Sequence, residues 1–172
     1  MRRKIIIIAA ILAVGLVVGG FFLFSGDKAE KDDRSTIPAT ARTFMKKMID
    51  CDVQEATSLF AGEAKSSYMF FSGEVIEFAN GWMFNEPLDK WRYYLDEKAV
   101  PNEMLIWHKD RPLPENRADC GDDIPVIYLQ FNQMSKGKYS ISWYTLSNEP
   151  FFYSDFSQDL WNKARASGGS RF

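Results

Sequence analysis

A run of twenty residues near the N-terminus most constrains what this chain can be. Residues 5–24 read IIIIAAILAVGLVVGGFFLF and contain no charged or strongly hydrogen-bonding side chain. As a helix that rises about 1.5 Å per residue, the run is about 30 Å long, which matches the hydrocarbon core of a bilayer. The run therefore predicts a transmembrane helix.

The residues that flank this run indicate how it is inserted. Arg2, Arg3 and Lys4 precede it, and the segment that follows is mixed in charge. The positive-inside rule therefore places the N-terminus in the cytoplasm and residues 25–172 outside the membrane. A cleaved signal peptide has a shorter apolar region and small residues at its cleavage site, whereas this run ends in the bulky sequence FFLF. We therefore expect an uncleaved signal anchor, with a cytoplasmic stub and membrane span at residues 1–24.

Small residues mark one side of the predicted membrane helix. Gly15 and Gly19 form a GxxxG pattern, and Gly20 adjoins it. Such a face lets two helix backbones approach closely, so it predicts a contact with another membrane helix or with a second copy of this chain. The alternative is that glycine is simply frequent in membrane helices.

The remaining residues divide into a linker and one domain. Residues 25–35 read SGDKAEKDDRS, without apolar periodicity, which is typical of a solvated linker. Residues 36–172 suffice for a single domain, and the chain is 46% hydrophobic, enough to form a core. Apart from the three basic residues at the N-terminus, there are 18 basic and 23 acidic side chains, a net charge of −5. Because nucleic acid selects basic surfaces, we expect no nucleic-acid partner.

The start of the domain predicts two helices. Apolar residues recur at helical spacing after Pro38, which suits a first helical turn, and they predict a helix over residues 38–50. Asp52 and Glu55 have the spacing of a capping box. The apolar residues that follow predict a second, short helix that ends near Gly62.

These two helices carry a resemblance to a known fold. The segment TARTFMKKMIDCDVQEATSLFAGEAKS is similar to the start of small secreted domains with the nuclear-transport-factor-2-like (cystatin-like) fold, whose pattern is matched by Asp52, Ala56, Leu59 and Phe60. The resemblance implies an α+β domain in which N-terminal helices pack on a curved antiparallel sheet around a cone-shaped cavity. It implies no activity, because this fold hosts enzymes, binding modules and scaffolds of secretion machines.

The second half of the chain is rich in strand patterns. Before a turn that contains Gly137, apolar side chains recur at every second position, and after it Tyr139, Ile141 and Trp143 alternate with Ser140, Ser142 and Tyr144, which predicts a β-hairpin. Residues 64–100 have no clear period, and within them residues 89–95 fit either a strand or a helical turn. Residues 167–170 look frayed. The predicted elements are strands at residues 104–108, 124–131 and 139–144 and a last helix at residues 155–164.

The chain has two cysteines, Cys51 and Cys120. In an oxidising envelope they are expected to pair as a structural disulfide, closing a loop of about 70 residues and stabilising the fold by about 4 kcal/mol. The alternative is two separate buried thiols. Neither cysteine lies in a CxxC motif or beside an activating base in the sequence, so no redox activity is predicted.

One histidine and the aromatic residues are the remaining candidates for a site. His108 is the only histidine, and it serves either as a half-buried structural residue or as a general base. Trp107 and Trp143, with Phe151 and Phe152 in the segment NEPFFY, are candidates for a pocket or a partner surface; the alternative is that they are core. The acidic residues around Cys120 fit a solvated loop better than a cation site; they are Glu115, Asp119, Asp122 and Asp123.

These patterns favour a non-enzymatic, single-pass protein of a bacterial inner membrane with a periplasmic domain. No Asn-x-Ser/Thr sequon is present, which favours a bacterial envelope. The sequence has no phosphate-binding loop, Ser/His/Asp order or metal-ligand spacing, so no cofactor or metal is expected. The main hypothesis is a scaffold or accessory subunit of a membrane complex such as a secretion machine, with other envelope proteins or itself as partner. The alternatives are a binding module for a small apolar or lipid ligand, and an isomerase- or hydrolase-like enzyme that uses His108.

Overall fold

The computed structural model describes residues 32–50, 52–61, 86–120, 126–135, 137–147 and 156–172. From Asp33 onward the chain forms one compact unit. No helix in these described ranges is long and apolar enough to cross a membrane. The predicted anchor at residues 5–24, with Gly15, Gly19 and Gly20, lies outside them, so the anchor and its helix contact stay predictions.

The first predicted helix is confirmed. Helix α2 spans Ile37–Ile49 and carries Pro38 in its first turn. Its N-cap is Thr36, whose side-chain oxygen accepts a hydrogen bond from the backbone N–H of Ala39 at 3.2 Å. The apolar side chains predicted for one face of this helix, including Phe44, are buried.

The second helix is present but shorter than predicted. Helix α3 spans Val53–Thr57, and its N-cap Asp52 accepts from the backbone N–H of Glu55 at 3.3 Å. The expected end near Gly62 is wrong. The chain leaves the helix because Leu59 and the next two residues extend along a strand, where the Leu59 carbonyl accepts from Ile141 N–H at 2.8 Å. Backbone pairing with the sheet replaces further helical turns.

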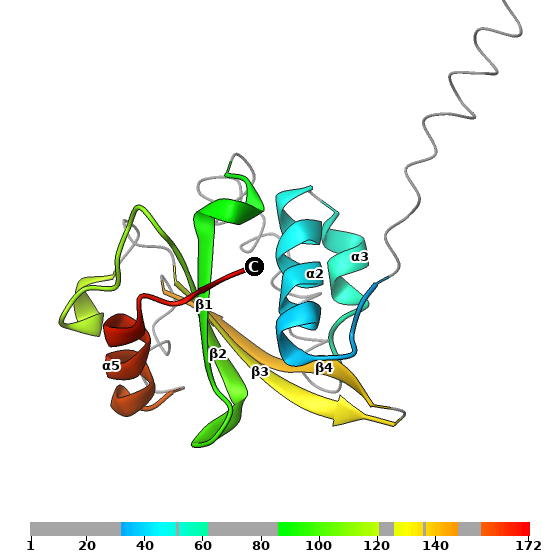
Figure 1. Ribbon diagram of the computed structural model, residues 1–172. Helices are drawn as coiled ribbons and strands as arrows, with labels where there is room; N and C mark the ends of the chain where they lie inside the picture. Colours follow the sequence, from blue (N-terminus) through cyan, green and yellow to red (C-terminus); the bar gives the residue numbers. More distant parts are fainter. Residues whose placement is uncertain (1–31, 51, 62–85, 121–125, 136, 148–155) are drawn as a thin grey trace, which may run out of the picture. The chain divides into compact units, whose positions relative to one another are not determined.

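The sheet has five strands in the order β4-β3-β2-β1-β5, and all neighbouring strands are antiparallel (Figure 1). The α+β class with an antiparallel sheet is therefore confirmed. The predicted hairpin is the pair β3 and β4, whose turn contains Gly137 with φ 68°. A short 3-10 helix, η1 (Leu88–Lys90), precedes β1, and a second, η2 (Arg117–Asp119), follows β2. The strands are β1 (Trp91–Asp96), β2 (Val100–His108), β3 (Val126–Met134), β4 (Lys138–Leu146) and β5 (Ser170–Arg171).

Two segments that were uncertain in the sequence are strands. Asp89 and Lys90 belong to the 3-10 helix η1 and residues 91–96 form β1, so the segment 89–95 is the end of a helical turn followed by a strand. Helix α5 (Gln158–Ser167) starts three residues later than predicted, and Gly168 ends it in the left-handed conformation. The expectation that residues 167–170 are frayed is wrong, because Ser170 and Arg171 pair with β1.

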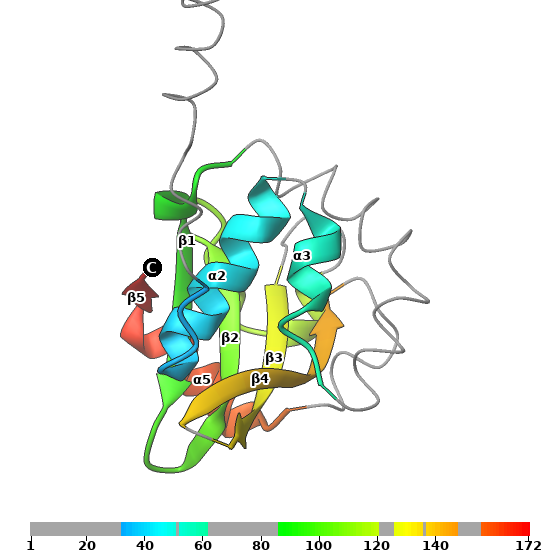
Figure 2. The same ribbon diagram turned by 90° about the vertical axis from the view of Figure 1, so that its right-hand side faces the viewer.

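The two faces of the sheet have different covers, and we name them the α2 face and the α5 face (Figure 2). Successive strand residues point to opposite faces, so Ile106 and Leu129 pack with α2 and α3, whereas Leu105 and Tyr128 pack with α5. Figures 1 and 2 both place α2 and α3 on one side of the sheet and α5 on the other. Each face forms its own buried cluster.

Candidate functional site

The predicted site residues do not form one group. His108 and Trp107 are neighbours on β2, so their side chains lie on opposite faces of the sheet. Trp107 belongs to the cluster of the α5 face. His108 is four residues after Met104 on the same strand, so its side chain points to the α2 face, as that of Met104 does. Trp143 lies on β4 and is exposed. Phe151 and Phe152 lie outside the described residues.

His108 is buried at the end of the ladder between β1 and β2. Only 7% of its surface is exposed, and its ring meets that of its strand partner Trp91 edge-on at 5.4 Å. Its Nδ1 accepts a hydrogen bond from the backbone N–H of Asp110 at 3.3 Å. In the neutral ring this bond places the proton on Nε2.

Two buried N–H groups lie at this end of the ladder without a hydrogen-bond partner in the described structure: His108 Nε2 and Trp91 Nε1. The carboxylate of Glu86 is 3.6 Å from His108 Nε2, just beyond hydrogen-bond length, and its side chain is 43% exposed. Lys90 pairs with Asp110 nearby at 3.3 Å, and this hydrogen bond raises the pKa of Lys90. A carboxylate thus stands beside the histidine, as the enzyme hypothesis requires.

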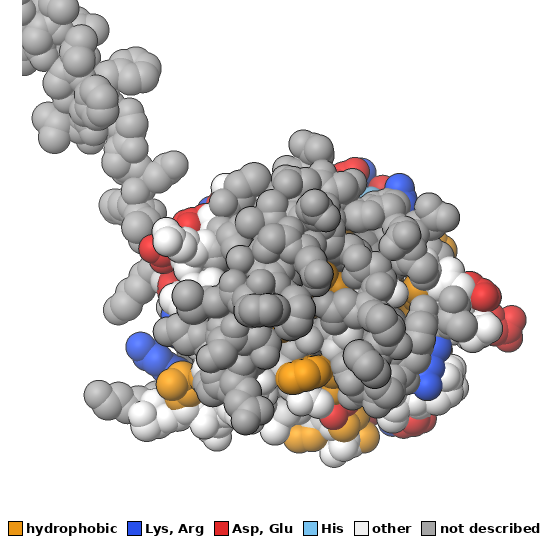
Figure 3. All heavy atoms as spheres, turned by 180° about the vertical axis from the view of Figure 1, so that it is seen from behind, with side chains coloured by type: hydrophobic (Ala, Val, Ile, Leu, Met, Phe, Trp, Pro, Cys, Tyr) orange, Lys and Arg blue, Asp and Glu red, His pale blue; other side chains and the backbone are white. Residues whose placement is uncertain are grey.

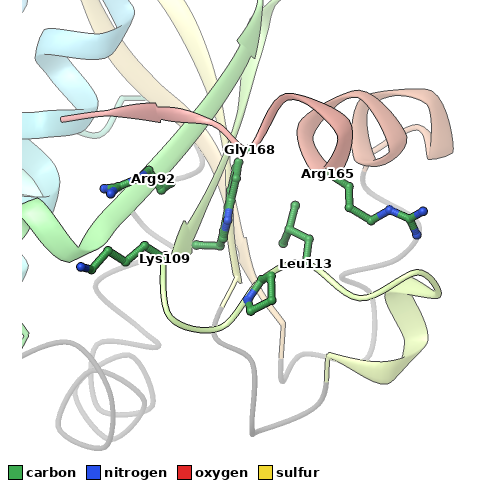
Figure 4. Close-up of a pocket in the computed structure, with 7 residues that line it drawn as sticks. Arg92, Lys109, Leu113, Arg165 and Gly168 are labelled. Atoms are coloured by element: carbon green, nitrogen blue, oxygen red, sulfur yellow. The ribbon is translucent and has the colours of Figure 1, made fainter.

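A pocket of about 350 Å³ opens on the other side of β2, on the α5 face (Figure 4). Its walls are formed by residues of the neighbouring strands β1 and β2, of the loop after β2, and of the end of α5. Trp107 is in its wall, and His108 is not, so the pocket and the histidine are separate features. The lining residues are Arg92, Trp107, Lys109, Pro112, Leu113, Arg165 and Gly168.

Glycine lets the chain pass close to the Trp107 ring. Gly168 and Gly169 have φ of 69° and 73°, a conformation that other residues rarely adopt. A Cβ on Gly169 would lie 2.6 Å from Cη2 of Trp107 and 3.1 Å from Cβ of Arg92. By contrast, a Cβ on Gly168 would meet no atom within 4 Å. The pair of glycines therefore brings the end of α5 to the edge of β1.

Trp143 and Met134 are the exposed large hydrophobic residues of the described chain, at 41% and 45%. Figure 3 shows described hydrophobic side chains at the lower margin of the molecule seen from behind. The register pairs Trp143 with Gln130, and Gln130 Nε2 donates to the Tyr128 hydroxyl at 2.6 Å. Tyr128 belongs to the α5-face cluster, so Trp143 faces the same side. Its Nε1 donates to the Thr145 hydroxyl at 3.1 Å.

Cys120 is a buried thiol of the α5-face cluster. In the reduced protein, burial raises the pKa of this thiol to about 12, so it stays protonated at neutral pH. Cys51 lies outside the described residues, so the disulfide stays a prediction. Asp122 and Asp123 are also outside them, and the part of the chain that the structure describes contains no cluster of acidic, histidine or cysteine residues that could hold a metal.

No family model, curated protein or solved structure matches this chain. The resemblance to the nuclear-transport-factor-2-like fold therefore stays a prediction, and the function must be argued from the residues. Sequence reasoning pointed to Trp107 and Trp143 but missed the basic residues of the pocket. Arg92, Lys109 and Arg165 are far from one another in the sequence, and no local pattern shows that they line one cavity.

Proposed function

We propose that this protein is a single-pass, membrane-anchored envelope protein whose domain binds a protein partner, as a scaffold or accessory subunit of a membrane complex. The observation that carries the proposal is the exposure of Trp143, at 41%, in a chain whose other described tryptophans, Trp91, Trp107 and Trp161, are buried. Tryptophan is the residue most enriched at the energetic centres of protein interfaces. The apolar run at residues 5–24 supports the membrane location.

The face of β4, rather than its edge, is the surface that suits a partner. The outer edge of β4 already pairs through its backbone: Tyr139 N–H donates to the Arg34 carbonyl at 2.9 Å, and Ile141 pairs with the segment at Leu59. An added strand would have to displace these bonds. Trp143 instead stands on the sheet face, and polar Thr145 and Gln130 lie beside it, as in the polar surroundings of an interface centre.

Site-specific photocrosslinking of the full-length protein in its own membrane tests this proposal. We expect a photoreactive phenylalanine analogue at Trp143 to give an adduct with an envelope protein or with a second copy. The same analogue at Lys98, an exposed position in the turn between β1 and β2, is the matched control and should give none. Trp143→Ser should release the partner without lowering the melting temperature of the domain by more than about 2 °C.

The scaffold proposal fails if the protein runs as a lone monomer in mild detergent and residue 143 gives no adduct.

The pocket favours a second candidate function, the binding of a small ligand with an apolar part. Its volume of about 350 Å³ is in the range of small-molecule sites, and Trp107 and Leu113 give it an apolar wall. The third hypothesis, an enzyme that uses His108, gains a carboxylate neighbour in Glu86 but no support from this pocket, which His108 does not line.

A further inference from the structure

We infer that the pocket on the α5 face binds a small amphipathic anion: an apolar group held against Trp107 and Leu113, and a carboxylate or phosphate held at the end where Arg92 and Lys109 lie. This inference rests on the second candidate function, the ligand-binding pocket, and narrows its ligand class. It is independent of the partner surface at Trp143, which lies on a different strand.

The walls of the pocket suit an apolar group. The exposed Pro112 contributes carbon surface together with the small accessible parts of Trp107 and Leu113, which are 3% and 5% exposed, and the backbone at Gly168 leaves open space where a side chain would otherwise stand. Trp107 is held in place, because it is 3% exposed and its ring lies against Gly169. A rigid aromatic wall of this kind binds a ligand at little cost in side-chain entropy.

Positive charge is concentrated at one end of the pocket. Figure 4 shows Arg92 and Lys109 on one side of the pocket and Arg165 on the other, with their charged ends directed outward from Leu113. Arg92 Nη1 donates to the backbone carbonyls of Asp89 at 2.9 Å and Trp91 at 2.8 Å. These bonds orient the guanidinium, but a carbonyl has no net charge, so the positive charge remains available to an anion.

The neighbouring carboxylate does not cancel this charge. Asp110 is 3.9 Å from Lys109 Nζ but only 3.3 Å from Lys90 Nζ, so it is shared between two cations. Glu86 also acts on Lys90, so the three cations Arg92, Lys109 and Lys90 face the two carboxylates of Asp110 and Glu86. A local excess of positive charge is notable in a domain with a net charge of −5, and it complements an anionic ligand.

The opposite end is closer to neutral. Arg165 Nη2 is 4.0 Å from Glu115 Oε1, and both side chains are exposed. One cation there faces one carboxylate. We therefore assign the anionic group of the ligand to the end of Arg92 and Lys109, and this assignment makes Arg165 an internal control with the same charge.

A matched pair of probes tests the inference: 4-phenylbutyrate and its neutral amide, 4-phenylbutanamide. The full-length protein is held in phosphatidylcholine nanodiscs, and binding is measured by calorimetry and by ligand-observed NMR against empty nanodiscs. We expect the carboxylate to bind about fivefold more tightly than the amide, because an exposed charge contact contributes roughly this factor. Equal binding of the two probes, or no binding of either, would overturn the inference.

Charge-matched variants locate the anion within the pocket. Lys109→Gln should weaken binding of 4-phenylbutyrate about fivefold and leave the amide unchanged, whereas Arg165→Gln should change either by less than about twofold. The reverse order of the two variants would contradict the assignment.

Gly168→Asn tests the cavity itself, because asparagine tolerates the left-handed conformation and its side chain would enter open space. It should abolish binding of both probes while the melting curve shows that the domain is folded.

The failure of this inference is distinguishable from failure of the scaffold proposal. Lys109→Gln and Gly168→Asn should leave crosslinking at residue 143 intact, and Trp143→Ser should leave binding of 4-phenylbutyrate intact. If Trp143→Ser removes binding of the probe, the ligand is on the surface of β4 and not in the pocket, and the inference is wrong.

Discussion

The described helices cover the two faces of the sheet differently. The α2 face lies under two helices, α2 of thirteen residues and α3 of five, and its cluster includes residues of β1, β2, β3 and β4. Among the described residues, the helix on the α5 face is α5, of ten residues, which packs on β1 and β2. The pocket and the exposed Trp143 both occur on this face, and they are the candidate surfaces of the described chain.

The α2 face also contains buried polar groups, at the end of the ladder between β1 and β2. Trp91 and His108 bury N–H groups there that have no partner in the described structure, and each such group has a free-energy cost on burial. Glu86 is close enough to form a bond with His108 after a small shift. This face is therefore a core with one polar point, whereas the α5 face borders the pocket and carries the exposed Trp143.

The largest expected effect comes from removing one large side chain from each face. Trp161→Ala on the α5 face and Phe131→Ala on the α2 face each leave a cavity, because both residues are buried, and each should lower the free energy of unfolding by about 3–5 kcal/mol. Since the two clusters share the same strands, urea unfolding followed by circular dichroism and by fluorescence should give one coincident transition for both variants. A separate early transition for Trp161→Ala alone would show that α5 unfolds independently.

The contact between the end of α5 and Trp107 should produce the next largest effect. Gly169→Ala combines a left-handed φ of 73° with a Cβ 2.6 Å from the Trp107 ring, so we expect a loss of about 2–3 kcal/mol. Gly168→Ala has nearly the same φ, 69°, but no atom within 4 Å, and should lose about 1 kcal/mol. The difference between the two, measured by urea unfolding, gives the contribution of the close approach. Equal losses would mean that Trp107 moves aside freely.

The N-cap residues of α2 and α5 allow the two helices that cover the sheet to be compared. Ser157 caps α5 by accepting from Leu160 N–H at 3.1 Å, as Thr36 caps α2. Ser157→Ala and Thr36→Ala should each lower stability by about 1 kcal/mol. Among the described residues, α2 packs against α3 whereas α5 has no second helix beside it, so hydrogen exchange should accelerate within α5 in the first variant more than within α2 in the second. Ser157→Asp keeps an acceptor and should behave like the wild type.

The smallest effect concerns an ion pair that ties α5 to β1. Lys163 Nζ is 2.9 Å from Asp96 Oδ2. The hydrogen bond from Lys163, together with backbone N–H donors in the adjoining turn, lowers the pKa of Asp96. A lowered pKa in the folded state adds stability above the pKa of the unfolded chain, and this stability is lost as the pH falls through the folded value.

Asp96→Asn should therefore be slightly less stable than the wild type at pH 7, and the difference should shrink as the pH falls through the lowered pKa of Asp96. Thermal unfolding across this range measures the trend. Glu97→Gln, which removes an exposed carboxylate from the same turn, is the control and should show a smaller difference. A difference that is constant with pH would exclude this ion pair as its source.

Local patterns explain which elements were predictable. Helix α2 and the hairpin of β3 and β4 depend on periodic apolar residues and on a turn glycine, all of which are adjacent in sequence. Strand β1 has no such pattern because it is covered on both faces: Trp91 packs toward α2 and Tyr94 toward α5. A strand with apolar residues on both sides loses the alternation that identifies it. The end of the segment 167–170 is ordered by strand pairing, because Ser170 pairs with β1, which is far away in the sequence.

The sequence by itself determined the α+β class, the N-terminal helix pair and the hairpin, and it singled out the tryptophans and the one histidine. Only the tertiary structure decided which helices cover the opposite faces on which Trp107 and His108 lie, and that Arg92, Lys109 and Arg165 line one pocket. The physical reason is the range of the interactions. Helix and turn formation depend on residues within a few positions of each other, whereas a pocket is assembled by strand pairing and by the packing of α5 between residues that are distant along the chain.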